Sequence, residues 1–302
     1  MFYRLRRNLK YFKFHKRIQR LLDTPPLIIQ DAHQQDSPLN IVSMVAGYDV
    51  KLYILAIKAF YRRIGHGRIT AITDGVSAEG KALLEKHIPG IEIVPVETID
   101  TGSIQRGGTW ERLLFCIDRS ATHFVIQLDA DVLCVGPMQE VLDAVQANRA
   151  FTLAEGIPKK PLNSWVADAY AKKSDNIVID FEMQGPQYPD SDKILYLRGS
   201  SGFAGFARGA IDRAFVQDFY GKALQLMGPR WKEWGTEQIS SNFCIANSPD
   251  SFGLPWPRYM TWEHHRIPPD ISLMHFLGYC RFDDDVLVNY ANREIDAMLG
   301  VK

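Results

Sequence analysis

Residues 124–135 read FVIQLDADVLCV, and this stretch decides the fold class of the chain. Its apolar start predicts a buried β-strand at residues 123–128, and a second apolar run follows Asp131. Earlier in the chain, strands are expected at residues 40–46, 68–73 and 91–96, with helical spacing at residues 50–64, 77–87 and 109–120. This alternation predicts an α/β protein with a mostly parallel sheet that helices cover on both faces.

The second half of the chain continues the pattern less regularly. Strands are expected at residues 200–207 and 271–275, and helices at residues 211–226, 236–247 and 283–299. Residues 156–193 have weak periodicity, which predicts a loop with one short helix near residues 163–171.

The composition is that of an ordinary globular protein. The chain has 302 residues, 46% of them hydrophobic and 23% charged, and a formal net charge of zero. This balance gives no whole-molecule attraction to nucleic acid, so we expect no nucleic-acid partner. The cysteines are scattered and three lie in apolar runs, which favours buried thiols in a reducing compartment. We found neither a secretory signal nor an apolar run of the ~18–20 residues that span a bilayer, so the cytoplasm is expected.

Polar residues follow three of the expected strands. Residues 46–49 (AGYD) end the first strand, Asp74 ends the second, and Asp129 and Asp131 end the fourth. Asp49 also stands where it could cap the helix that begins at residue 50. Ligands of open α/β sheets bind beyond the carboxyl ends of the strands, so we expect a nucleotide to lie here.

The two carboxylates of the LDAD stretch predict a divalent metal site. A nucleotide-sugar diphosphate needs its leaving charge neutralised, and Mn²⁺ or Mg²⁺ held by Asp129 and Asp131 would do that. No Lys or Arg neighbours them in sequence, so burying both would be costly without a cation. Two alternatives remain. The two aspartates could have no role beyond capping the turn that follows. Alternatively, Asp129 could be the nucleophile of a haloacid-dehalogenase-like phosphatase. That motif usually ends the first strand, whereas at least three βα units precede it here.

Residues 274–281 read MHFLGYCR and supply three further candidates. The imidazole of His275 is a suitable ligand for a Mn²⁺-like ion. Gly278 allows backbone to approach a phosphate, and Arg281 can bind two phosphate oxygens.

Together these stretches resemble family 8 glycosyltransferases, the glycogenin and bacterial galactosyltransferase group with the A-type fold. The resemblance runs over about residues 40–285. LDADVLCVG is similar to the family's Asp-x-Asp strand, and HFLGYCR to its His-x-x-Gly-x-x-Lys, with Arg281 in the place of the phosphate-binding Lys. TWERL resembles the family's Tyr-x-Arg-Leu helix start, in which the Arg contacts the donor sugar, and this implicates Arg112.

Three weaker matches complete the resemblance. GTEQISSN resembles the family's Asp-Gln-Asp helix start, which faces the transferred sugar and the acceptor, and becomes Glu237-Gln238-Ile239 here. RGSSGFAGF resembles its Asn-Ser/Ala-Gly strand, with Ser200 or Ser201 in the place of Asn. Ala46-Gly47-Tyr48 resembles the uracil-binding edge.

The resemblance implies transfer of a sugar from a nucleotide diphosphate donor, expected to be a UDP-sugar, to a glycan or lipid-linked acceptor. It implies catalytic roles for Arg112, Glu237 and Gln238. It implies a metal bound by Asp129, Asp131 and His275, and a donor bound by Ala46, Tyr48, Asp74, Arg112, Asp129, Gly278 and Arg281. The incomplete Asp-Gln-Asp match leaves open a non-catalytic sugar-nucleotide-binding protein, and the sequence leaves retention or inversion of the anomer open. Among the late tryptophans, Trp234 is expected near the site.

Residues 1–36 are expected to form a segment separate from a catalytic domain at residues 37–302. Residues 1–22 contain eight Lys or Arg and no acid, and Phe2, Leu5, Leu9 and Phe12 would share one helical face. This pattern is typical of a helix bound to an anionic membrane surface. The alternative is a helix that packs its apolar stripe on the main domain. Pro25-Pro26 and the polar residues 31–37 resemble a linker.

Overall fold

The computed structural model describes residues 2–29, 37–172 and 174–301. The strands expected in the first half form as β1 (Leu39–Ala46), β2 (Arg68–Asp74), β3 (Glu92–Pro95) and β4 (Phe124–Leu128). They lie parallel in the order β4-β1-β2-β3, and all five residues of β4 are buried. Strands buried on both faces need continuous apolar runs, which explains the composition of residues 124–128.

Three more strands extend this sheet beyond β4. The strand β9 (Gly199–Phe206) pairs antiparallel with β4 and with β6 (Phe151–Ala154), and β10 (Phe252–Leu254) lies beyond β6. Within the described residues the sheet has seven strands in the order β10-β6-β9-β4-β1-β2-β3. A mostly parallel sheet is therefore confirmed. The short strands β6 and β10 carry too little periodicity to be predicted alone.

A second, smaller sheet lies beside the end of β4. It contains β5 (Val132–Cys134), β11 (Tyr259–Trp262) and β12 (Leu273–Phe276), with β12 in the middle. The residues 129–131 therefore form the turn at which the chain passes from the large sheet to the small one. A third pair, β7 (Lys160–Pro161) and β8 (Leu195–Tyr196), is antiparallel.

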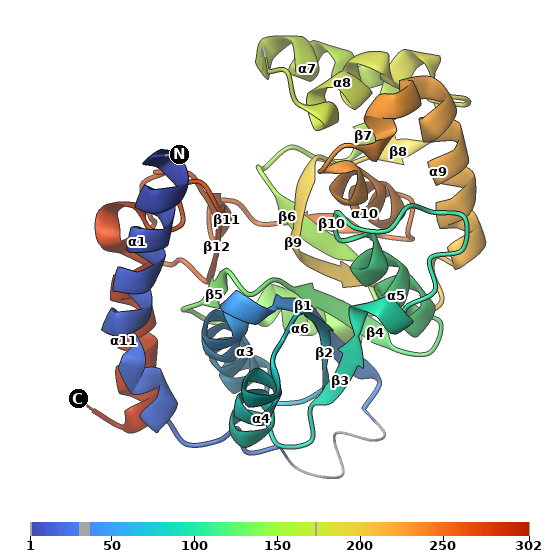
Figure 1. The fold of residues 1–302 in the computed structure, drawn as a ribbon. Coiled ribbons are helices and arrows are strands. Elements are labelled where there is room, and N and C mark those ends of the chain that lie inside the picture. Colours follow the sequence, from blue (N-terminus) through green and yellow to red (C-terminus); the bar gives the residue numbers. More distant parts are fainter. Residues whose placement is uncertain (1, 30–36, 173, 302) are drawn as a thin grey trace.

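Helices cover both faces of the large sheet, as predicted (Figure 1). On one face lie α3 (Val50–Ile64) and α4 (Ala78–His87), and on the other α5 (Trp110–Ser120), α9 (Arg213–Met227) and α10 (Thr236–Ala246). From β1 to β3 the chain moves along the sheet in one direction, whereas after α5 it returns past β1 to β4. Because crossovers between parallel strands are right-handed, the helices of the outward path and the helix of the return path lie on opposite faces. Ser77 caps α4, since its Oγ accepts a hydrogen bond from Gly80 N at 3.2 Å. Two further helices are the short α6 (Gln139–Gln146) and the longer α11 (Val286–Leu299).

The region expected as a loop with one short helix contains two α-helices among its described residues. These are α7 (Val166–Lys172) and α8 (Ile177–Gln184), which Figure 1 places above the main sheet. Asn176 begins α8 by accepting a hydrogen bond from Val178 N at 2.7 Å. Phe181 of α8 contacts the rings of Phe219 and Trp231, at centroid distances of 5.9 and 5.6 Å. The helix is apolar on most sides, so it has no amphipathic period to detect.

The N-terminal segment forms α1 (Phe2–Arg17) and a 3₁₀ turn, η1 (Gln19–Asp23), and α1 runs beside α11 (Figure 1). Phe14 and Ile18 are buried against the main body, and the rings of Phe14 and Phe282 lie 5.0 Å apart. Leu9 and Phe12 remain 52% and 68% exposed. The helix therefore packs with one face and exposes the other. The expected linker at residues 31–37 lies almost entirely outside the described residues, as do the side chains of Phe2 and Leu5.

A buried lysine holds the end of this segment. Lys58 of α3 is 2% exposed, and its Nζ donates hydrogen bonds to Thr24 Oγ1 at 2.7 Å and Pro25 O at 2.6 Å. Burial lowers the pKa of Lys58 to about 8. Among the described helices, none combines the length and the apolar character that crossing a membrane requires.

Candidate metal and donor site

The turn between β4 and β5 holds both aspartates of the LDAD stretch by backbone hydrogen bonds. Asp129 N donates to Gly202 O of β9 at 2.8 Å, and Val132 N donates to Asp129 O at 3.1 Å. Phe276 N of β12 donates to Asp131 O at 2.9 Å. Both sheets thus fix the turn, and the two carboxyl groups are held at the carboxyl edge of the large sheet.

His275 reaches this turn from β12, where it pairs in register with Val132. Its Nε2 lies 3.4 Å from Asp131 Oδ1, and its Nδ1 lies 2.9 Å from Ser200 Oγ. The strand β9 leaves room for the ring only because residue 202 is glycine, since a Cβ there would lie 2.5 Å from the imidazole.

The three predicted metal ligands therefore converge. One ligand atom from each of Asp129, Asp131 and His275 lies within 4.8 Å of the others. Two carboxylates and one imidazole suit a divalent ion such as Mn²⁺, and carboxylates also suit Mg²⁺. The contact with Ser200 orients His275 in the way that outer partners orient metal-bound imidazoles. The residues present thus fit a divalent metal.

Two arginines from distant parts of the chain also reach the aspartates. Arg112 of α5 pairs with Asp129, and its second nitrogen lies 3.3 Å from Glu237 Oε2. Arg281 pairs with Asp131 and lies 3.6 Å from Asp49 Oδ1. The aspartates have no neighbouring Lys or Arg along the sequence, but the expectation that they lack a cation is wrong, because the fold brings Arg112 and Arg281 against them.

The site nevertheless keeps an excess of negative charge. Four carboxyl groups, those of Asp49, Asp129, Asp131 and Glu237, face two guanidinium groups, which leaves a formal charge of −2 when all are ionised and His275 is neutral. A divalent cation would bring this sum to zero. Buried charges are stable only when they are compensated, so the charge count supports a metal independently of the ligand geometry.

The pKa values of the acidic groups respond to burial and to these partners. Burial raises the pKa of Asp129 to about 6, although Arg112 opposes the rise. Burial likewise raises the pKa of Asp49 to about 6, against the effect of Arg281. Burial also opposes ionisation of Asp131, but Arg281 and His275 outweigh it and hold its pKa below the usual range. Asp131 is thus the most firmly ionised of the three.

The starts of α5 and α10 meet next to Asp129. Glu237, in the first turn of α10, is buried, and its Oε2 accepts hydrogen bonds from Thr109 Oγ1 at 2.9 Å and Ser201 Oγ at 3.1 Å. Trp110 Nε1 donates to Thr236 Oγ1 at 3.3 Å, which joins the two helix starts directly. Glu237 therefore pairs with one terminal nitrogen of Arg112 while Asp129 pairs with the other.

A cavity of about 640 Å³ adjoins this network. Ser200 lies on its wall, and so do the predicted residues Gln238 and Gly278. Trp234 and Tyr279 also line it and are 79% and 61% exposed. Trp234 thus lines the cavity next to the candidate metal ligands.

The predicted nucleoside residues lie at the ends of β1 and β2. Ala46 pairs in register with Asp74, which is exposed. Tyr48 is 69% exposed and lines a separate cavity of about 350 Å³, together with Tyr11 and His15 of α1. Within the described part of the chain, none of Ala46, Tyr48 and Asp74 lines the larger cavity.

Asp49 occupies the N-cap position of α3, as expected, but it does not cap the helix with its side chain. Its side chain makes no capping hydrogen bond to α3 and instead faces Arg281. Its position shortly after the end of β1, at the carboxyl edge of the sheet, was the only signal in the sequence for this role. Thr109 was likewise missed as a partner of Glu237, because only the fold brings the two together.

Comparison with known proteins gives no match in sequence and a clear match in structure. No family model and no curated protein matches the chain. The galactosyltransferase LgtC, in complex with donor and acceptor sugar analogues, is similar with a TM-score of 0.50 and 11% identity over 87% of this chain and 96% of that chain. An active-site mutant of LgtC gives a TM-score of 0.51 at 11% identity, over 86% and 95% of the two chains.

The bifunctional glycosyltransferase WbbM, in its apo structure, gives a TM-score of 0.51 at 12% identity over 86% of this chain. This chain covers 52% of the WbbM chain, about half of its length. Identities this low carry information about the fold alone. The chain has the A-type nucleotide-sugar transferase fold that its sequence predicts, and its likeness to the family 8 enzymes is a distant one.

Proposed function

We propose that the protein is a glycosyltransferase that moves a sugar from a nucleotide diphosphate donor, expected to be a UDP-sugar, to a glycan or lipid-linked acceptor. The observation that carries the proposal is the convergence of Asp129, Asp131 and His275 with Arg112 and Arg281, at the carboxyl edge of the sheet. Carboxyl edges of open α/β sheets are where such ligands bind. The cytoplasmic location stays a prediction.

In this proposal Asp129, Asp131 and His275 hold a divalent ion, which when bound neutralises the charge of the leaving diphosphate. Arg281, next to Asp131, binds a phosphate oxygen, and Gly278 lets the backbone approach it. Arg112 and Glu237 position the transferred sugar beside Asp129.

The acceptor would enter the cavity of about 640 Å³, which Gln238 lines. The exposed rings of Trp234 and Tyr279 at this cavity offer apolar faces on which a sugar ring can pack. Ala46, Tyr48 and Asp74 are proposed to bind the nucleoside at the ends of β1 and β2.

The fold argues against the phosphatase alternative. Asp129 follows the fourth strand along the chain, whereas the phosphatase nucleophile ends the first, and Arg112 occupies one of its oxygens. The non-catalytic alternative is tested by turnover, because a sugar-nucleotide-binding protein would bind the donor and release no nucleoside diphosphate.

The proposal is tested by incubating the protein with a panel of nucleotide sugars, with and without Mn²⁺. A true donor is expected to raise the melting temperature in the presence of Mn²⁺, because a ligand stabilises the state that binds it. The same donor should yield free nucleoside diphosphate. A panel with neither binding nor release would refute the proposal, and binding without release would favour the non-catalytic alternative.

Arg281→Ala is expected to weaken binding of the nucleoside diphosphate product. A charge-assisted hydrogen bond contributes about 1.5–3 kcal/mol, so the dissociation constant should rise at least about tenfold in calorimetry. Arg293→Ala, which removes an exposed arginine from α11, is the matched control and should leave the affinity unchanged. Equal affinity of the two variants would place Arg281 outside the donor site.

A further inference from the structure

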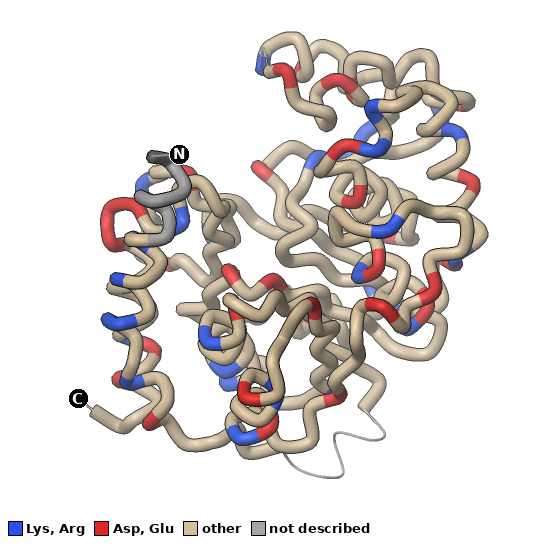
Figure 2. The backbone as a smooth tube through the Cα atoms, in the orientation of Figure 1, with Lys and Arg blue, Asp and Glu red and all other residues tan. Residues whose placement is uncertain are grey.

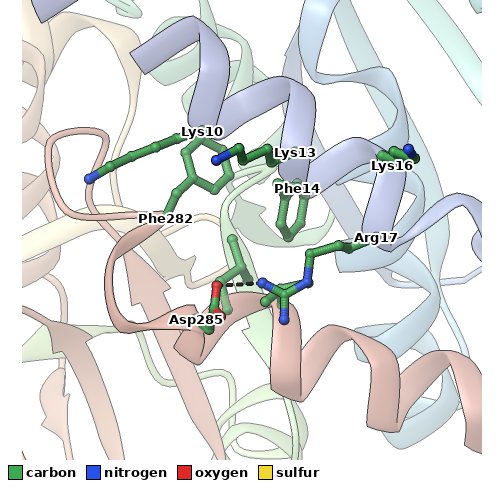
Figure 3. Close-up of a pocket in the computed structure, with 9 residues that line it drawn as sticks. Lys10, Lys13, Phe14, Lys16, Arg17, Phe282 and Asp285 are labelled. Carbon is green, nitrogen blue, oxygen red and sulfur yellow. Dashed lines mark hydrogen bonds and ion pairs between the residues drawn. The ribbon is translucent and has the colours of Figure 1, made fainter. Parts of the chain in front are cut away.

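A third cavity lies under α1, and none of the three candidate metal ligands lines it. Its volume is about 250 Å³, and it lies between α1 and the start of α11. Figure 3 shows Phe14 and Phe282 beneath α1 and Arg17 turned toward Asp285. Leu287 and Val288 complete an apolar lining. The opening is bordered by cations, namely Lys10, Lys13, Lys16 and Arg17.

Only part of this positive charge is compensated within the protein. Lys10 pairs with Asp283, and Arg17 lies 2.5 Å from Asp285. Lys13 and Lys16 are exposed, and the described residues offer them no acidic partner. Figure 2 shows lysines and arginines along the described part of α1, with acidic residues in the turn beside it. The cavity thus has an apolar interior and two free cations at its opening.

The free lysines share a face of α1 with exposed apolar residues. Positions 9, 12, 13 and 16 follow the i, i+3, i+4, i+7 spacing of one helical face. Leu9 and Phe12 on this face are 52% and 68% exposed. The opposite face holds Phe14 and Ile18, which are buried in the protein. The exposed face of α1 is therefore both apolar and basic, although the opposite face of the helix already packs against the protein.

We propose that this face and cavity bind an anionic phospholipid at a membrane surface. Leu9 and Phe12 enter the boundary between headgroups and acyl chains, and Lys13 and Lys16 bind headgroup phosphates. The cavity beneath takes part of an acyl chain against Phe14 and Phe282. Charge and polarity together favour an anionic phospholipid, because a free anion would not need the apolar lining and a neutral lipid would not need the lysines.

The proposed lipid-binding surface lies close to the proposed donor site. Phe282 directly follows Arg281 in the chain, and Asp283 pairs with Lys10 of α1. A membrane bound by α1 would therefore lie next to the segment that carries Gly278 and Arg281. This arrangement favours a lipid-linked acceptor over a free glycan.

The test is flotation of the full chain with vesicles of phosphatidylcholine alone or with added phosphatidylglycerol. The wild-type protein should float with the anionic vesicles, less so at high salt, and not with phosphatidylcholine alone. Lys13→Gln combined with Lys16→Gln should lower the partition coefficient about thirtyfold, since each lysine contributes about 1 kcal/mol near such a surface. Lys86→Gln combined with Lys193→Gln removes the same charge from exposed positions elsewhere and should have little effect.

Two further measurements separate the parts of the proposal. Phe12→Ser, at an exposed position, should weaken flotation without lowering the melting temperature. Soluble short-chain phosphatidylglycerol should bind the wild-type protein in calorimetry, whereas inorganic phosphate at the same concentration should not. Equal flotation of the two double variants, or none with anionic vesicles at low salt, would overturn the proposal. Flotation needs neither donor nor turnover, so its outcome is independent of the proposed transferase activity.

Discussion

Asp131→Asn is expected to abolish metal-dependent release of nucleoside diphosphate from the donor. Asp131 lies against His275 at 3.4 Å and against Arg281, and its pKa is held low, so it is the best preformed anionic ligand of the site. Loss of an outer partner of a metal ligand costs about ten- to a hundredfold in affinity or activity, and loss of a ligand itself should cost more. The measurement is turnover against Mn²⁺ concentration, with the melting temperature recorded for each variant.

Two further variants, with smaller expected losses of activity, test the same prediction. Ser200→Ala removes the hydroxyl that orients His275, and should raise the Mn²⁺ concentration needed for half-maximal activity by about ten- to a hundredfold. Asp218→Asn, at an exposed position of α9, should leave both activity and metal dependence unchanged. The expected order of loss is Asp131→Asn, then Ser200→Ala, then Asp218→Asn.

Chelation tests the same site without a mutation. We expect excess chelator to remove the activity of the wild-type protein, and added Mn²⁺ or Mg²⁺ to restore it. Activity that survives chelation would also be interpretable, because two arginines contact the aspartates. Full activity in chelator would show that Arg112 and Arg281, which already neutralise the aspartates in part, suffice for the leaving diphosphate. The metal would then have no role in turnover.

The sequence predicts the parts of this site that depend on local pattern. An apolar run followed by two carboxylates identifies a strand end, and strand ends of a parallel sheet share one edge, so Asp129 and Asp131 could be placed there. His275 could be added because it also follows an apolar run and is a metal-ligating residue type. In each case the residue type and its place at the end of an apolar run made the residue a candidate, and the resemblance to family 8 glycosyltransferases grouped the three as metal ligands.

The ion pairs of the site could not be predicted in this way. Arg281 and Asp49 are 232 positions apart, and their contact depends on how the small sheet is set against the large one. The cap expected of Asp49 is a local interaction, whereas its actual partner comes from the other end of the chain. The helix α8 was missed for a related reason, because burial on most sides removes the polar face that marks a surface helix.

Glu237→Gln is expected to lower turnover by at least about a hundredfold while leaving donor affinity nearly unchanged. The side chain is buried and accepts hydrogen bonds from Thr109, Ser201 and Arg112, so an isosteric amide keeps the packing but removes the charge. Arg112 would then be balanced by Asp129 alone and would be drawn toward the metal site. The ion pair between Glu237 and Arg112 should affect turnover more than donor binding, because charge develops on the donor in the transition state.

Two roles for Glu237 make different predictions, and a double-mutant cycle separates them. If Glu237 only positions Arg112, then Glu237→Gln combined with Arg112→Met should be no worse than the more damaging single variant. If Glu237 is a base that accepts a proton from the acceptor, the losses should add, and the pH profile of turnover should lose its acidic limb in Glu237→Gln.

The geometry favours the positioning role. Both oxygens of Glu237 face donors of the protein, and its neighbour Gln238, not Glu237, lines the cavity of about 640 Å³. We therefore expect the losses of turnover in the two single variants to be non-additive, and the pH profile of turnover to be unchanged in Glu237→Gln. Analysis of the product anomer by NMR completes the test, since inversion of the anomer together with additive losses would make Glu237 the base instead.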